Sequence, residues 1–218
     1  KVIIVKRLLL TSLFLIGCGS GGESVELVDQ VESVEPPVKQ IEMVSHRGIN
    51  AQDNTIEAFQ NAINLGFDSV EMDIRLFNGE VVMAHDKQSS GVDYDYFSDA
   101  LILAGNANVK IWIEAKEREA IKPMVELLNH YGVTNYIFTA YYQEWIDEFR
   151  ALNNEAKTGL IVTDINKIET LNTDWVLVDK KLLPINTDKK IAVWTIKQSE
   201  EYDMYNGMVD AFISDIER

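Results

Sequence analysis

The stretch "VEMDIRLFNGEVVMAHD" (residues 70–86) contains two apolar runs joined by a very short connection. Residues 70–76 and 80–86 have the composition of β-strands. The three residues between them, Phe77-Asn78-Gly79, cannot hold a helix, and Asn-Gly is the strongest short signal for a β-hairpin. We therefore predict that residues 80–86 fold back beside residues 70–76.

This hairpin would bring His85 back level with Asp73. Side chains alternate between the two faces of a strand, so a strict two-residue turn would put His85 and Asp73 on opposite faces. A three-residue loop or a β-bulge would put them on the same face. We expect the second arrangement, in which the imidazole and the carboxylate share a face.

Outside the hairpin, short apolar and β-branched runs alternate with helical patterns. Residues 54–66 have apolar residues at helical spacing, with Asn54 and Glu57 as a capping box and Gly66 as a stop signal. Residues 119–132 and 141–152 show the same spacing. The buried faces of these two helices are expected to carry Ile121, Met124, Val125 and Leu128, and Trp145, Ile146, Phe149 and Leu152.

Repeated strand–helix–strand units favour parallel pairing with right-handed crossovers. The pattern thus predicts an α/β fold, a small (β/α)8 barrel of the TIM type with a hairpin after its second strand and some helices reduced to loops. An open doubly wound sheet is the alternative. The eight strands are expected at residues 41–46, 69–74, 109–114, 135–139, 157–162, 175–179, 191–196 and 210–214.

The first 40 residues have a different character. A basic flank, an apolar stretch at residues 8–16 and small residues after it predict a secretory signal at residues 1–17, because a bilayer span needs about 20 apolar residues. Leu15-Ile16-Gly17-Cys18 resembles a bacterial lipobox, whose Cys is lipidated; an ordinary signal peptide with an incidental Cys is the alternative. We expect an exported bacterial lipoprotein, anchored to a membrane and facing the periplasm or the cell surface.

Residues 18–40 are small and acidic and predict a disordered linker before a barrel domain at residues 41–218. The net charge of −15 argues against nucleic acid and against electrostatic attachment to anionic lipid. Cys18 is the single Cys, so the domain has no thiolate nucleophile, Cys metal site or disulfide.

In a barrel, the C-terminal ends of the strands meet at one mouth. Three acids at alternating positions suit a hard divalent cation such as Mg²⁺ or Ca²⁺, and two cations suit a phosphate oxygen. Two histidines could share acid and base roles on opposite sides of a phosphorus. The residues expected there are His46, Arg47, Glu71, Asp73, His85, Glu114, Lys116 and Trp194.

Taken singly, these residues have simpler explanations: His46 could be a hydrogen-bonded strand end, and Trp194 is more often core than ligand wall. Their joint occurrence on convergent strand ends favours a site. His130, at a helix end before Gly132, is expected only to complement the helix dipole. For "YYQEW" (141–145) we favour packing on a helix face over a rim for a ligand.

At these residues the chain resembles the glycerophosphodiester phosphodiesterase family. The resemblance covers about residues 42–216, and residues 209–215 resemble the family's closing strand. The motifs that carry it are His46-Arg47-Gly48, Asp53-Asn54-Thr55, Glu71-x-Asp73, His85-Asp86, Glu114-x-Lys116 and Trp194-Thr195.

The resemblance implies metal-dependent hydrolysis of small phosphodiesters, glycerophosphodiesters above all, to an alcohol and glycerol phosphate. One divalent cation, Mg²⁺ or Ca²⁺, would be bound by Glu71, Asp73 and Glu114. His46 and His85 would exchange protons, while Arg47, Lys116 and Trp194 would bind substrate. Two alternatives stay open: a lyase or phosphotransferase that forms a cyclic phosphate, and a non-catalytic lipoprotein that binds a phosphorylated ligand.

The chain departs from the family pattern in two places. Gln52-Asp53 stands where the family usually has Pro-Glu, which loses the rigid Pro and shortens the acid by one methylene. Only 28 residues separate His85 from Glu114, where the family usually carries a longer insertion over the mouth. This reduction bears on the specificity for glycerol.

Overall fold

The computed structural model describes residues 40–89 and 91–217. The expected signal peptide (1–17), the lipidation site Cys18 and all of the expected linker except Gln40 lie outside the described residues. No helix in the described part is long and apolar enough to cross a membrane.

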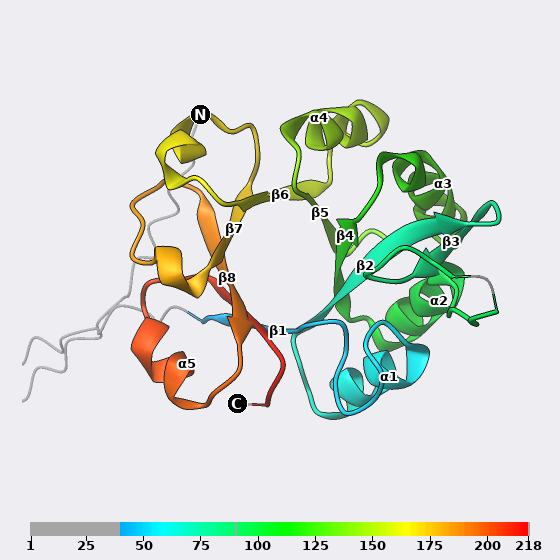
Figure 1. Cartoon of the computed structure of the whole chain (residues 1–218), viewed down its shortest axis with the longest axis horizontal. Helices are drawn as coiled ribbons and strands as arrows, with labels where there is room; N and C mark the ends of the chain where they lie inside the picture. Colours follow the sequence, from blue (N-terminus) through cyan, green and yellow to red (C-terminus); the bar gives the residue numbers. More distant parts are fainter. Residues whose placement is uncertain (1–39, 90, 218) are drawn as a thin grey trace, which may run out of the picture. The chain divides into compact units, whose positions relative to one another are not determined.

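Eight parallel strands form a closed barrel, as Figure 1 shows. Strand β1 pairs with β9 on one side and with β2 on the other, which closes the ring and excludes the open sheet. The barrel prediction and all eight expected strands are confirmed. The strands are β1 (Glu42–Ser45), β2 (Ser69–Phe77), β4 (Lys110–Ala115), β5 (Tyr136–Ala140), β6 (Lys157–Val162), β7 (Trp175–Asp179), β8 (Lys190–Ile196) and β9 (Ala211–Ser214).

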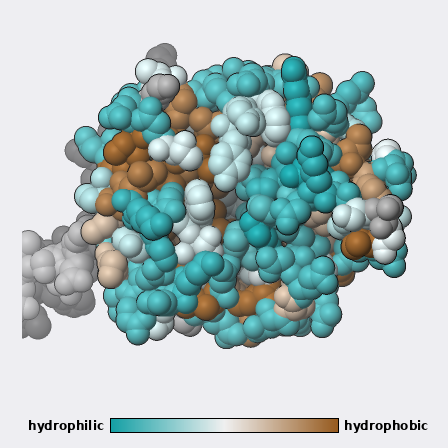
Figure 2. Space-filling view, viewed as in Figure 1, coloured by the Kyte–Doolittle hydropathy of each residue, from teal (hydrophilic) through white to brown (hydrophobic). Residues whose placement is uncertain are grey.

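Helices cover the barrel unevenly. The described α-helices are α1 (Ile56–Asn64), α2 (Phe97–Ala107), α3 (Ile121–Tyr131), α4 (Gln143–Leu152) and α5 (Glu200–Tyr205). A 3-10 turn, η1 (Arg118–Ala120), precedes α3, and β6 and β7 are followed only by the 3-10 turns η2 (Ile165–Thr170) and η3 (Lys180–Leu182). This confirms the reduction of some helices. Figure 2 shows an apolar area at upper left, on the side where these short connections lie in Figure 1.

The predicted helix faces pack on the barrel with one exception. All four residues expected on the inner face of α3 are buried, as are Ile146 and Phe149 of α4. Leu152 is 45% exposed, contrary to the prediction, because α4 ends at this residue and the chain turns away toward β6. Trp145 is partly buried against the core.

The start of α1 differs from the expected capping box. Thr55 is the N-cap, and its hydroxyl accepts a hydrogen bond from the backbone N–H of Ala58 at 3.2 Å. Asn54 has a φ of +58°, and its side chain points away from the helix toward Asp73. The prediction that Asn54 caps the helix is therefore wrong, because a residue one position further along takes that place.

The hairpin between β2 and β3 (Glu80–Met83) has a strict two-residue turn. Phe77 pairs with Glu80, and Asn78 and Gly79 both have positive φ, as the type I′ turn requires. The expected three-residue loop or bulge is wrong, because Asn-Gly satisfies the tighter turn. Ala84, not His85, lies opposite Asp73, whose carbonyl accepts from the Ala84 N–H at 3.0 Å.

The lower interior of the barrel is filled with apolar side chains. Trp112 of β4 and Trp175 of β7 meet edge to face with ring centroids 4.8 Å apart. Aliphatic residues from the other strands surround this pair, so the interior is a packed core and not a pore. Ile161, Leu177 and Ile213 of this layer also line the cavity at the mouth, so the layer forms the floor beneath it.

Gly48 provides a test of how tightly the loop after β1 is packed. Its φ is +83°, and a Cβ there would lie 2.5 Å from the Ala58 Cβ and 2.6 Å from the Ala58 carbonyl carbon. We expect Gly48→Ala to lower the free energy of unfolding by about 3 kcal/mol, from backbone strain and overpacking together. Urea denaturation of the 218-residue chain would measure this.

Gly105→Ala is the matched control, because Gly105 lies in α2 and a Cβ there would meet nothing within 4 Å. That variant should be neutral or stabilised by up to about 1 kcal/mol. Equal stabilities of the two variants would contradict the close packing of Gly48 on α1.

Candidate active site at the barrel mouth

Three carboxylates meet at the upper ends of β2 and β4. The parallel register pairs Asp73 with Glu114, and Glu71 lies two residues earlier on the same face of β2. One oxygen from each of the three residues lies within 4.8 Å of the other two. All three side chains are buried, Asp73 completely.

Burial and mutual repulsion make these acids hard to ionise. Desolvation, followed by the charges of Asp73 and Glu114, raises the pKa of Glu71 well above its ordinary value. Desolvation and the charge of Asp73 raise the pKa of Glu114 to about 7, although Lys116 opposes this. A donor set made of carboxylate oxygens, with this much unbalanced repulsion, fits a hard divalent cation.

Two basic side chains contact the cluster. The Arg47 Nε lies 2.9 Å from Asp73 Oδ2, and the backbone N–H of Arg47 donates to Glu71 Oε2 at 3.0 Å. Lys116 Nζ lies 3.2 Å from Asp73 Oδ1 and 2.5 Å from Glu114 Oε1. The carboxylates and the two expected phosphate-binding cations thus belong to one buried network.

Asn54 orients the central acid and was not expected to do so. Its side-chain Nδ2 donates to Asp73 Oδ2 at 2.9 Å, while its Oδ1 accepts from the Asp73 backbone N–H at 2.8 Å. The amide thereby holds both the side chain and the backbone of Asp73. The signal in the sequence is the position of Asn54 in the Asp-Asn-Thr motif, although its composition also suits a helix cap.

His46 lies just after β1 and is held by Asp215, just after β9. The His46 Nδ1 is 2.6 Å from Asp215 Oδ1. Partial burial opposes ionisation of Asp215, but the hydrogen bond and charge of His46, together with Lys197, keep the pKa of Asp215 below its ordinary value. Sequence reasoning missed Asp215, although it follows the closing strand at the same mouth.

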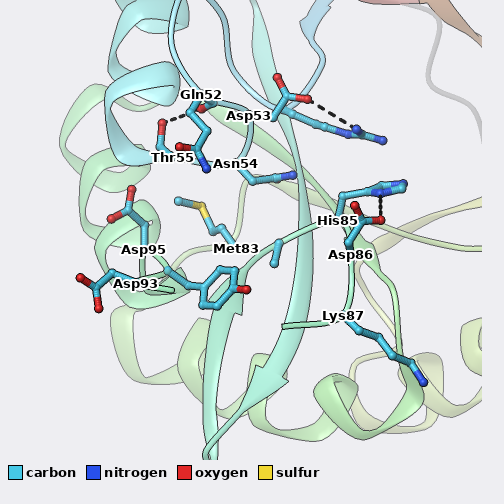
Figure 3. Close-up of a pocket in the computed structure, with 13 residues that line it drawn as sticks. Gln52, Asp53, Asn54, Thr55, Met83, His85, Asp86, Lys87, Asp93 and Asp95 are labelled. Carbon is cyan, nitrogen blue, oxygen red and sulfur yellow. Dashed lines mark hydrogen bonds and ion pairs between the residues drawn. The ribbon is translucent and has the colours of Figure 1, made fainter. Parts of the chain in front are cut away.

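His85 reaches the mouth from the segment after β3. Its Nδ1 lies 2.9 Å from Asp86 Oδ1, and Figure 3 shows the two side chains turned toward each other. The hydrogen bond from His85 lowers the pKa of Asp86, whose side chain is 94% exposed. His85 is thus the more exposed of the two mouth histidines, at 41% against 19% for His46.

A cavity of about 160 Å³ connects these groups. Asp73 does not line this cavity, but it forms ion pairs with Arg47 and Lys116, which do. The indole Nε1 of Trp194 is buried with no hydrogen-bond partner among the described residues. Of the eight residues expected at the mouth, those that line the cavity are His46, Arg47, Glu71, His85, Glu114, Lys116 and Trp194.

A second cavity of about 320 Å³ adjoins the first, and Arg47 and His85 line both. Figure 3 shows its other walls, which carry Asp53, Asp86, Asp93 and Asp95.

Tyr141 was expected to pack on a helix face and instead lines the smaller cavity. It precedes α4, and Lys116 Nζ lies 5.5 Å from the centre of its ring. His130, by contrast, lies in the last turn of α3 and does not line this cavity, in keeping with the structural role expected for it.

The fold and the site together define a barrel with a buried carboxylate cluster, two cations and two histidines at its mouth, which is the class of site that handles phosphoryl groups. Residues 46–93 match the family model described as "Glycerophosphoryl diester phosphodiesterase family". That segment contains five of the eight mouth residues. No curated protein sequence gives a significant match to this chain.

Solved structures share the fold. A glycerophosphodiester phosphodiesterase from Parabacteroides distasonis has 16% identity and a TM-score of 0.73, covering 82% of this chain and 94% of its own. A phosphodiesterase from Oleispira antarctica, in complex with the product sn-glycerol-3-phosphate, has 20% identity and a TM-score of 0.71, covering 80% and 92%. One from Agrobacterium tumefaciens has 16% identity and a TM-score of 0.68, covering 81% and 97%.

Residues 46–93 thus resemble this family, and the barrel shares its fold with these solved structures.

The raised pKa of Glu114 predicts how pH affects stability. In the folded protein the pKa of Glu114 is about 7, whereas an unfolded glutamate has a pKa of about 4.3. Between these values the folded state holds more protons than the unfolded state, so stability falls as pH rises, by up to about 1.4 kcal/mol per pH unit. Because a divalent cation binds the ionised acids, Mg²⁺ or Ca²⁺ should raise the Tm more at pH 8 than at pH 5.

Thermal unfolding with and without each cation would measure this. Glu114→Gln should reduce both the pH dependence and the cation effect, whereas Glu119→Gln, at an exposed position in η1, should change neither. If the cation raised the Tm equally at both pH values, and did so in Glu114→Gln as well, Glu114 would not be a ligand of the cation.

Proposed function

We propose that this protein hydrolyses small glycerophosphodiesters to an alcohol and glycerol phosphate at the barrel mouth, with one divalent cation. The observation that carries the proposal is a single cavity lined by two histidines, two cations and two of three clustered acids. The sn-glycerol-3-phosphate bound to the Oleispira antarctica phosphodiesterase supports the choice of substrate. The family match over residues 46–93 supports the reaction class.

Glu71, Asp73 and Glu114 would hold the cation, Mg²⁺ or Ca²⁺. When bound, it would polarise the phosphoryl group and offset the charge that grows on its oxygens. Arg47 and Lys116, which the structure places at the edge of the same cluster, contribute further positive charge to those oxygens. The buried indole N–H of Trp194, which has no partner among the described residues, would donate to substrate at the cavity wall.

The two histidines would move the protons. Each engages a carboxylate through Nδ1, which leaves Nε2 for substrate. One Nε2 accepts the proton of the attacking hydroxyl, either water or the neighbouring glycerol hydroxyl, while the other donates a proton to the leaving oxygen. Attack by the glycerol hydroxyl forms a cyclic phosphate, which water then opens. Such acid–base help typically adds about 10²–10⁴-fold to the rate.

Hydrolysis of glycerophosphocholine by the full chain would test this function, with phosphorus NMR to follow the products. We expect turnover with Mg²⁺ or Ca²⁺, none with EDTA, and losses of about 10²-fold or more in His46→Ala and Glu71→Ala. His130→Ala, outside the site, should keep full activity. Accumulation of a cyclic phosphate would instead indicate a lyase or phosphotransferase, and no turnover with any cation would favour a binding protein.

The same proposal includes export and a lipid anchor at Cys18. The basic flank, the apolar stretch and the Leu15-Ile16-Gly17-Cys18 motif support it. In a bacterial host, Cys18→Ala should move the protein from the membrane fraction to the soluble fraction, as judged by fractionation and blotting. Membrane association unaffected by this substitution would refute the anchor.

A further inference from the structure

The hairpin register creates a problem for His85. The two-residue turn places Ala84 opposite Asp73, so continued pairing would direct His85 to the face away from the carboxylates. His85 nevertheless lines the cavity that Glu71 and Glu114 line. The chain therefore leaves the pairing with β2 after Ala84, and a contact other than sheet pairing has to hold the backbone at His85.

Arg75 contacts this backbone directly. It lies on the same face of β2 as Asp73, two residues further along. Its Nε and Nη2 both donate to the backbone carbonyl of His85, at 3.0 and 2.9 Å. Two donors of one planar guanidinium on a single oxygen fix both the distance and the direction of that carbonyl.

Glu117 holds the arginine from the other side. Its Oε2 accepts from Arg75 Nη1 at 3.2 Å, and its Oε1 accepts from the Leu76 backbone N–H at 2.5 Å. The side chains of Arg75 and Glu117 are 12% and 25% exposed, so the pair is largely shielded from water. A carboxylate tied to the backbone of β2 thus keeps the guanidinium in place.

The hydrogen bond at the His85 ring is more exposed to water than the pair formed by Arg75 and Glu117. Its partner Asp86 is 94% exposed and belongs to the same short segment, so it cannot anchor that segment to the barrel. The clamp formed by Arg75 and Glu117 instead connects this segment to β2 and to the second residue after β4.

We infer that Arg75, held by Glu117, is the positioning residue that brings His85 to the cavity against the register of its own hairpin. The inference rests on the proposed function where it concerns catalysis, because it assigns to Arg75 an effect that acts through His85.

A double-mutant cycle tests it in the full chain with glycerophosphocholine and the preferred cation. Arg75→Gln should lower kcat by about 10–100-fold and change KM by less than about threefold, because a displacement of about 1 Å can cost that much in rate. In a His85→Ala background, Arg75→Gln should cost nothing further. An equal loss in both backgrounds would overturn the inference, since Arg75 would then act independently of His85.

Arg118→Gln is the matched control. Arg118 also bonds a glutamate, Glu148, at 2.6 Å, but on the exposed outer surface of the barrel. It should retain the kcat of the parent protein. Arg75→Lys should recover part of the lost rate by keeping one donor on the carbonyl. Where Arg75→Gln fails to fold, Glu117→Gln replaces it in the cycle, because the amide still accepts from Leu76 but no longer pairs with Arg75 as an anion.

Imidazole NMR separates this inference from the proposed function, because the chain has three histidines and each signal can be assigned by substitution. Arg75→Gln should shift or broaden the ring signals of His85 and leave those of His46 and His130 unchanged. An unchanged His85 signal would overturn the clamp. An inactive parent protein with a perturbed His85 signal would instead refute the proposed function and keep the clamp.

Discussion

Burial of three carboxylates at one end of a closed barrel is the constraint on which the rest of the site depends. The parallel register of β2 and β4 places Asp73 and Glu114 side by side. The packed layer around Trp112 and Trp175 fills the barrel interior, so these side chains have no space there. An unpaired buried charge lowers the stability of the fold, so neighbouring elements have to supply groups of opposite charge. Arg47 and Lys116 provide them here, and a bound cation would complete the compensation.

The loop between β1 and α1 adopts unusual backbone conformations in order to make these contacts. Arg47 and Asn54 both have φ near +57°, a region that residues other than glycine rarely occupy. This geometry directs the Arg47 N–H at Glu71 and the Asn54 amide at Asp73. Local strain of about 1–3 kcal/mol at each such position is retained only where surrounding contacts compensate for it, and the carboxylates supply those contacts.

Much of the fold could be predicted because strand and helix periodicities are local properties. The residues of the carboxylate cluster were predictable for the same reason: alternation along β2 and convergence at strand ends follow from strand geometry alone. What failed depended on single contacts across the fold. Asn is a residue type suited to a helix cap, but the side chain of Asn54 bonds to Asp73 and not to the helix. Asp215 contacts His46 from near the other end of the sequence, and local sequence patterns do not predict contacts between residues so far apart in the chain.

The two histidines show why counting residues along a strand is a weak guide to the face on which a side chain lies at the edge of a sheet. His46 follows a strand that is paired on both sides, so the barrel itself sets its position and Asp215 has only to orient the ring. β3 lies at the end of the sheet order, where it pairs with β2 among the described strands. Its last backbone bond to β2 runs from the Ala84 N–H to the Asp73 carbonyl, one residue before His85. Once pairing stops, the face of a side chain is no longer fixed by counting residues. Side-chain contacts to the backbone then decide it, and at His85 those contacts come from Arg75.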